Sequence, residues 1–179
     1  MSDPPNTNHA DASAAILVDG ELVFAVAEER LNRKKHYASF PKLAIRACLE
    51  AANLRLKDID HVALGRDRSA NVRQKIQYAL LNPSMFTNLM AIRRKAVSLD
   101  DLQTLLATGL EVDPAECRFT EHHVEHHQAH ISSAYFCSDF DQCAGLSYDG
   151  SGDFVSTMFA NCRGNKIEVL DRVYLPHSL

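Results

Sequence analysis

The sequence predicts an α/β fold, a mixed sheet with flanking helices. Paired β-rich runs occur near both ends of the chain, and segments with apolar residues at helical spacing lie between them. An order of hairpin, helix, strand, helices, strand, helix, strand and hairpin is typical of a sheet covered by helices, not of a bundle or a sandwich. The 179 residues, of which 46% are apolar, are enough for one domain with a core.

The first predicted hairpin follows a polar, proline-bearing leader at residues 1–8. Residues 14–18 and 21–27 are β-rich, and the dipeptide Asp19-Gly20 separates them. Both central residues of a type I′ turn need positive φ, and Asp-Gly is a strong signal for such a turn. We therefore expect an antiparallel hairpin here.

A charged segment at residues 28–36 follows the hairpin and holds four cations in six residues. Such a run is either a solvated loop or an anion site, because clustered Lys and Arg side chains suit phosphate. Pro41 is a plausible helix start, and residues 60–65 predict a short buried strand. The apolar stripe of the predicted helix consists of Leu43, Ala44, Ala47, Cys48 and Ala51.

Residues 69–109 are predicted to be helical. One apolar stripe runs through residues 72–80 and a second through residues 85–92. A third helix is expected to begin at Ser98, as the N-cap, and to end at Gly109. The methionines of this region are interpreted as core residues, since methionine fills irregular gaps.

β-Structure is predicted again in the second half of the chain. Residues 117–123 predict a strand that leads into a histidine-rich tract, and residues 143–148 predict another strand. Residues 154–161 and 167–175 are two β-rich runs joined by a short polar turn. These features predict a second hairpin near the end of the chain.

The histidine-rich tract at residues 121–130 contains five of the nine histidines. If a helix begins near His126, then His126 and His130 project from one helical face, with Cβ atoms roughly 5–6 Å apart. That spacing lets two imidazoles share a divalent metal. A carboxylate such as Asp149 would complete a set used by iron, manganese or zinc. The register stays open, because two other histidine pairs in the tract have the same spacing, and such a tract can also be solvated surface.

A glycine-rich loop, Asp149-Gly150-Ser151-Gly152, follows the strand at residues 143–148. Small residues let backbone N–H groups approach phosphate closely, so Gly150, Ser151 and Gly152 are candidate nucleotide-binding residues. The same composition also forms plain turns. Two hairpins, each beside an Asp-Gly loop, are similar to the actin-like ATPase fold, in which such loops face nucleotide phosphates and a metal.

Composition excludes several classes of protein. The net charge of −4 argues against a general nucleic-acid binder, which needs a basic face. No apolar run approaches the roughly 20 residues that cross a bilayer, and the N-terminus lacks the features of a signal peptide. Five cysteines without a C-x-x-C pair fit reduced thiols in a cytoplasm. We expect a cytoplasmic protein with no membrane or nucleic-acid partner.

Four motifs occur in a fixed order along the chain. They are His9-x-Asp11-x-Ser13-Ala14-Ala15 with Asp19-Gly20, Glu28-Glu29-Arg30-x-x-Arg33-x-Lys35-His36 with Phe40-Pro41, His126-His127-x-Ala129-His130, and Asp149-Gly150-x-Gly152-Asp153. Together they resemble the O-carbamoyltransferase family that includes the nodulation, cephamycin and tobramycin carbamoyltransferases. The likeness covers residues 9–179.

The resemblance implies an actin-like (ribonuclease H-like) domain that transfers a carbamoyl group to a hydroxyl of a small molecule. A separate C-terminal domain of the family makes carbamoyl-adenylate from carbamoyl phosphate and ATP. An iron-type metal, with zinc or manganese as alternatives, is implied on His126, His130 and Asp149, which selects the register. The resemblance also places the family's N-terminal histidine at His9, a candidate general base, and its phosphate-contacting lysine at Lys35.

Two departures from the family pattern lead us to expect an N-terminal fragment that is inactive alone. The apolar strand that precedes His9 in the family is missing from residues 1–8, and the family continues beyond Leu179. Pairing with the missing domain or a homodimer is therefore expected. Two alternatives are a non-catalytic metal-binding or partner-docking module and a relative of the tRNA threonylcarbamoyl enzymes. The acidic balance of the chain counts against the tRNA alternative.

Overall fold

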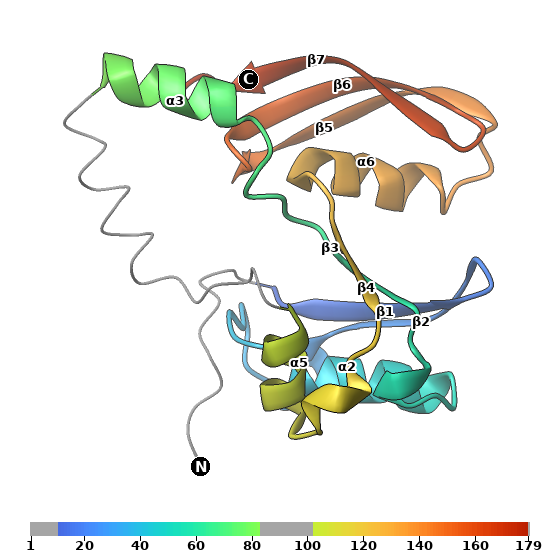
Figure 1. The fold of residues 1–179 in the computed structure, drawn as a ribbon. Helices are drawn as coiled ribbons and strands as arrows, with labels where there is room; N and C mark the ends of the chain where they lie inside the picture. Colours follow the sequence, from blue (N-terminus) through green and yellow to red (C-terminus); the bar gives the residue numbers. More distant parts are fainter. Residues whose placement is uncertain (1–10, 83–101, 179) are drawn as a thin grey trace. The chain divides into compact units, whose positions relative to one another are not determined.

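A computed structural model describes residues 11–82 and 102–178 (Figure 1). These residues form a mixed α/β structure of small sheets and several helices, as the sequence predicts. The chain divides into two compact units. Unit 1 comprises Met1–Val62 and Leu89–Thr120, and unit 2 comprises Ala63–Asn88 and Glu121–Leu179.

Unit 1 begins with the predicted hairpin, which the structure confirms. Strand β1 (Ser13–Val18) pairs with the antiparallel strand β2 (Glu21–Ala27). Asp19 and Gly20 have φ angles of 52° and 87°, the two positive values that a type I′ turn needs. A Cβ atom at Gly20 would meet no atom within 4 Å, so glycine serves only the backbone conformation here.

Helix α2 (Lys42–Ala51) packs on this hairpin, with Ala44 and Cys48 buried (Figure 1). The side chain of its N-cap residue, Pro41, makes no capping hydrogen bond. The Glu28 carboxylate takes that role by accepting the Ala44 N–H at 2.7 Å. Glu28 itself begins the short helix α1 (Glu28–Asn32) and is 2% exposed. The buried apolar residues of unit 1 are Ile16, Phe40, Ala44, Cys48, Leu56, Leu102, Leu106, Ala107, Leu110, Cys117 and Phe119.

Helix α5 (Leu102–Leu110) corrects one prediction. Gly109 does not end the helix, which runs to Leu110, and Glu111 follows with a φ of 61°. A Cβ atom at Gly109 would overlap the Phe40 ring, so glycine is required here for close packing. The predicted N-cap Ser98 and the apolar stripe at residues 85–92 lie outside the described residues.

Strands β3 (His61–Leu64) and β4 (Thr120–His123) form a two-stranded sheet, and the chain passes from one unit to the other within them. The strand predicted at residues 60–65 is confirmed, but the prediction that it is buried is wrong, because β3 alternates between exposed and half-buried positions. A sheet of two strands has too few neighbours to cover both of its faces.

Unit 2 is built on the antiparallel sheet β5 (Gln142–Gly152), β6 (Val155–Arg163) and β7 (Lys166–Tyr174), in that spatial order. The turn at Gly164, with a φ of 54°, joins β6 to β7 and confirms the second predicted hairpin. Helix α6 (His126–Tyr135) lies on one face of the sheet (Figure 1). The core between them consists of Ile131, Tyr135, Met158, Ala160 and Cys162.

Helix α3 (Val72–Leu81) also belongs to unit 2 and has no buried residue. The predicted helix is confirmed, but its apolar stripe is not part of a core, since Ile76 is 55% exposed and Leu80 75% exposed. Among the described residues, no helix combines the length and the apolar character that crossing a membrane requires.

Candidate metal centre

The start of helix α6 decides which histidines share a face. Strand β4 ends at His123, and Glu125 then caps the helix by accepting the Gln128 N–H at 2.9 Å. The helix begins at His126, so the preceding histidines of the tract lie in a strand and do not follow helical spacing. Within the described helix, His126 and His130 are the histidine pair four residues apart.

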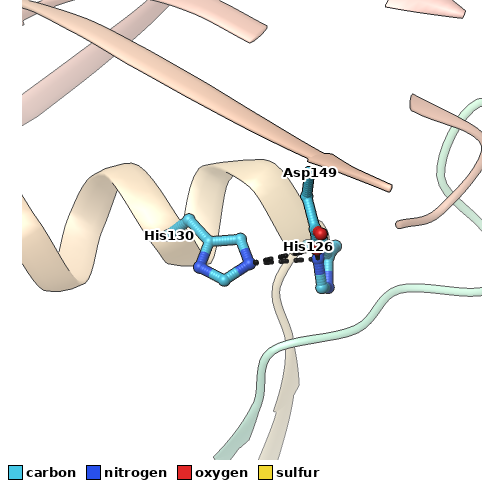
Figure 2. A group of neighbouring side chains, drawn as sticks. All are labelled: His126, His130 and Asp149. Carbon is cyan, nitrogen blue, oxygen red and sulfur yellow. Dashed lines mark hydrogen bonds and ion pairs between the residues drawn. The ribbon is translucent and has the colours of Figure 1, made fainter. Parts of the chain in front are cut away.

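The side chains of His126, His130 and Asp149 converge on one point (Figure 2). His126 Nε2 lies 3.0 Å from His130 Nε2 and 2.9 Å from Asp149 Oδ2, and the third separation, from His130 Nε2 to Asp149 Oδ2, is 3.7 Å. The two imidazoles come from successive turns of α6, and the carboxylate comes from β5. The structure therefore brings together the three residues predicted as metal ligands, although their role as ligands stays a prediction.

The spacing of these atoms fits a shared metal ion. With metal–ligand bonds of about 2.1 Å, neighbouring ligand atoms lie about 3.0 Å apart at right angles and about 3.4 Å apart in a tetrahedron. The observed separations fall around these values. All three atoms carry lone pairs when deprotonated, so their approach is favourable only if a proton or a cation lies between them. Two imidazoles and one carboxylate suit iron, zinc or manganese, and three protein ligands leave coordination positions open.

The electrostatics of the cluster favour deprotonated ligands. Partial burial of His130 and the neighbouring charge on His126 lower the pKa of the His130 imidazole below its ordinary 6.5. The hydrogen bond from His126, followed by the one from the Gly150 N–H, lowers the pKa of the Asp149 carboxyl below 3.8. Metal binding requires a neutral imidazole and an ionised carboxylate, so both shifts act in the direction that metal binding needs.

His127 has a different role from its two neighbours on α6. The ring is fully buried, its Nε2 atom donates to the Val155 carbonyl at 2.9 Å, and its Nδ1 atom lies 2.8 Å from Ser147 Oγ. A carbonyl oxygen only accepts, so Nε2 carries the proton and Nδ1 of the neutral ring accepts from the serine hydroxyl. These bonds join α6 to β5 and β6, and they turn the other face of the helix, with His126 and His130, away from the core.

The predicted nucleotide-binding loop lies within an irregular end of β5. The pairing with β6 breaks between Tyr148 and Gly152, and the Gly150 N–H donates to the Asp149 carboxylate. A Cβ atom at Gly152 would overlap the His126 ring, so the absence of a side chain at Gly152 serves the placement of that histidine. Ser151 is exposed. Phosphate binding by Gly150, Ser151 and Gly152 stays a prediction.

The remaining predicted site residues are Lys35 and His9. Lys35 is exposed in unit 1, in a loop that is stabilised by a hydrogen bond from the His36 N–H to Glu29 and by His36 Nδ1 near Asp11 Oδ1 at 3.2 Å. His9 lies outside the described residues. The cluster at α6 therefore consists of His126, His130 and Asp149, and the structure places neither predicted catalytic residue in it.

Asp153 is a residue whose role the sequence did not predict. Its carboxylate is 2% exposed and accepts the backbone N–H of His126 at 3.0 Å. The signal was present in the motif, as an aspartate directly after the glycine-rich loop, but nothing in the sequence indicated which N–H group it would bind. Asp153 thus belongs to the surroundings of the cluster of His126, His130 and Asp149.

A cavity of about 560 Å³ opens between α6 and β5, beside the cluster. His130 and Asp149 are part of its lining, together with Tyr135, Phe140 and Tyr148. Its volume is within the range of small-molecule sites, roughly 300–1,000 Å³, and its lining combines aromatic surface with a few polar groups. A small molecule in this cavity would reach the cluster from the side of His130.

Comparison with known proteins agrees with the motifs. Residues 6–179 match the family described as "Carbamoyltransferase N-terminus". The chain is 36% identical over 173 residues to the Nodulation protein NolNO of Sinorhizobium fredii, which covers 94% of this chain and 23% of that protein. It is 32% identical over 179 residues to the Uncharacterized protein sll1178 of Synechocystis sp. This match covers 94% of this chain and 28% of that protein. The chain spans about a quarter of the length of these relatives.

Proposed function

Because the chain belongs to the carbamoyltransferase N-terminus family, we propose that it is the metal-bearing part of an ATP-dependent O-carbamoyltransferase with an actin-like fold. The observation that carries this proposal is the cluster of His126, His130 and Asp149, whose three ligand atoms lie within 4.8 Å of one another. The carbamoyl donor would be carbamoyl-adenylate, formed from carbamoyl phosphate and ATP, and the acceptor would be a hydroxyl of a small molecule.

The three clustered residues would hold a divalent metal, with iron as the first candidate and zinc or manganese as alternatives. When bound, such an ion supplies Lewis acidity that stabilises negative charge on a phosphate or carbamoyl oxygen. Asp149 offsets part of the positive charge, while His126 and His130 offer neutral nitrogen donors. The half-exposed side chains of His130 and Asp149, at 54% and 46%, leave room for a substrate oxygen.

Two residues of the N-terminal segment complete the proposal. Lys35 is exposed and carries a positive charge that would contact the adenylate phosphate or the carbamoyl oxygen. His9 would accept the proton of the acceptor hydroxyl, because an imidazole titrates near neutral pH. The backbone of Gly150, Ser151 and Gly152 would approach the nucleotide phosphate.

Metal analysis of the purified chain tests the proposed ligands. We expect about one equivalent of iron, zinc or manganese in the wild-type protein, and a large loss in each of the variants His126→Ala, His130→Ala and Asp149→Ala. His122→Ala is the matched control, because His122 is an exposed histidine of the same tract that lies in β4. Unchanged metal content in the cluster variants, or an equal loss in the control, would show that the tract binds metal without this cluster.

Nucleotide binding separates a transferase from a non-catalytic metal-binding module. AMP is titrated calorimetrically into the metal-loaded chain, the metal-free chain and the metal-loaded Lys35→Ala variant. We expect binding that depends on the metal and weakens in the variant. Metal uptake without any AMP binding would favour the metal-binding module. Binding of unmodified tRNA, measured in parallel, would favour the tRNA-modifying alternative.

A further inference from the structure

We propose that Asp153 is a positioning residue that fixes His126 for metal binding, an inference that rests on the proposed metal site. Its Oδ2 atom accepts two backbone N–H groups from different segments, His126 at 3.0 Å and Asp67 at 2.8 Å. The Arg66 guanidinium lies 3.9 Å from Oδ1, and the Asn71 side chain donates to the Asp153 carbonyl at 3.0 Å. One residue thus joins the segment after β3 to the first residue of α6.

The burial of this carboxylate indicates a specific role. Its side chain is 2% exposed, and a buried charge is costly unless hydrogen bonds and opposite charges compensate it. Here the compensation consists of two N–H donors, the arginine and the N-terminal end of the α6 dipole, which favours an anion. Asp153 also has a φ of 47°, a left-handed conformation that is uncommon for residues other than glycine.

The loop at residues 149–153 contacts His126 in three ways. Asp149 Oδ2 binds the ring at Nε2, the backbone of Gly152 packs directly on the ring, and Asp153 Oδ2 holds the backbone N–H. Ring and backbone of the same histidine are therefore fixed by one short segment. His130 is reached by this loop only through Asp149, at 3.7 Å.

An amide cannot replace this carboxylate without a mismatch. Oδ2 accepts from two N–H groups while Oδ1 faces a guanidinium, so these three partners of the carboxylate are all donors. In Asp153→Asn one oxygen becomes an NH₂ group, which faces a donor in either orientation. We expect the first turn of α6 to shift and the His126 ring to leave its place beside Asp149.

The test compares cobalt(II) binding by the wild-type chain, Asp153→Asn and Asp67→Asn. Asp67→Asn is the matched control, because it removes a carboxylate from the neighbouring segment after β3. That carboxylate accepts the Ser69 N–H at 2.8 Å, whereas Asp153 is bound by the backbone N–H of Asp67. Affinity is measured by titration, and the visible absorption spectrum is recorded at saturating cobalt. Circular dichroism and thermal unfolding report folding in each variant.

We expect Asp153→Asn to bind cobalt roughly 10–100-fold more weakly, the usual effect of removing a residue that holds a metal ligand in place. We also expect an altered spectrum at saturation. Asp67→Asn should keep both the affinity and the spectrum. A purely structural role for Asp153 would lower the unfolding temperature while the folded variant kept the wild-type affinity and spectrum. That result would overturn the inference while leaving the metal site intact.

A metal-free measurement separates this inference from the proposed function. Hydrogen exchange of the His126 amide in the metal-free chain should accelerate in Asp153→Asn and not in Asp67→Asn, because only the first variant replaces the charged acceptor of this N–H by a neutral and weaker one. If the wild-type chain takes up no cobalt, the metal-site proposal fails and the role of Asp153 in metal binding fails with it. Faster exchange in that case would show that Asp153 stabilises the start of α6 without a role in metal binding.

Discussion

The chain contains two Asp-Gly dipeptides at hairpins, and the structure gives them different roles. Asp19-Gly20 joins β1 to β2 through a two-residue turn, and no atom lies within 4 Å of a Cβ built at Gly20. Asp149-Gly150 lies where the pairing of β5 with β6 is interrupted, and Asp149 binds His126. The same dipeptide is a plain two-residue turn in the first hairpin, whereas in the second it lies at a break in the strand pairing, beside the start of a helix.

The largest expected difference between the two dipeptides is in metal affinity. Asp149→Asn replaces a carboxylate of the cluster, so we expect a loss of affinity greater than the roughly 10–100-fold typical of outer contacts. Asp19→Asn should leave metal binding unchanged, because Asn-Gly also favours a type I′ turn. Titration with zinc or cobalt measures both variants, and equal behaviour of the two would contradict the difference in role.

Alanine at the loop glycines gives an intermediate effect. Gly152→Ala places a methyl group on the His126 ring, so we expect destabilisation of roughly 1–3 kcal/mol, as in other overpacked sites, together with weaker metal binding. Gly20→Ala introduces no clash but must adopt a φ of 87°, and we expect a cost of roughly 1 kcal/mol with metal affinity unchanged. Denaturant unfolding and metal titration separate the two outcomes. Loss of metal affinity in Gly20→Ala would contradict the comparison.

The smallest expected effect is the pH dependence of the metal-free chain. The pKa of Asp149 is lowered in the folded state, so its ionised form stabilises the fold above the unfolded pKa of about 3.9, and this contribution is lost as the pH falls through the lower folded value. The side chain is 46% exposed, and solvent screening limits the contribution to a few tenths of a kcal/mol.

Unfolding of the wild type and of Asp149→Asn between pH 6 and pH 2 measures this contribution. The stability difference attributable to the Asp149 charge should be largest above pH 4 and should disappear in acid. High salt should reduce it. A difference that grows as the pH falls would contradict the assigned direction.

Local signals explain which parts of the fold could be predicted. The turn at Asp19-Gly20 depends on two residues and was predicted correctly, as was the presence of a helix carrying His126 and His130. Four-residue spacing alone left the histidine register open. The start of α6 after β4 selects one pair, because His122 and His123 have extended backbone. Only the family resemblance had indicated that pair from the sequence.

Features that depend on distant contacts could not be predicted. Glycine is typical of a helix C-terminus, but at Gly109 the absence of a side chain serves the close packing of the Phe40 ring, which is distant in the sequence. The apolar stripe of α3 has helical spacing, yet Ile76 and Leu80 are exposed among the described residues. Asp153 stands at the end of the glycine-rich motif, but its role becomes visible only when the backbone of His126 is placed beside it.

The three proposed metal ligands and Asp153 all come from residues 126–153, one continuous stretch of chain. Closing so short a segment costs little conformational entropy, since that cost grows only with the logarithm of loop length. Recombination or a designed graft that transferred this stretch would carry the three proposed ligand residues in a single piece. The proposed ion-binding residues could therefore be inherited as one segment, which would still need the Asp67 N–H and the Val155 carbonyl from outside it to hold Asp153 and His127.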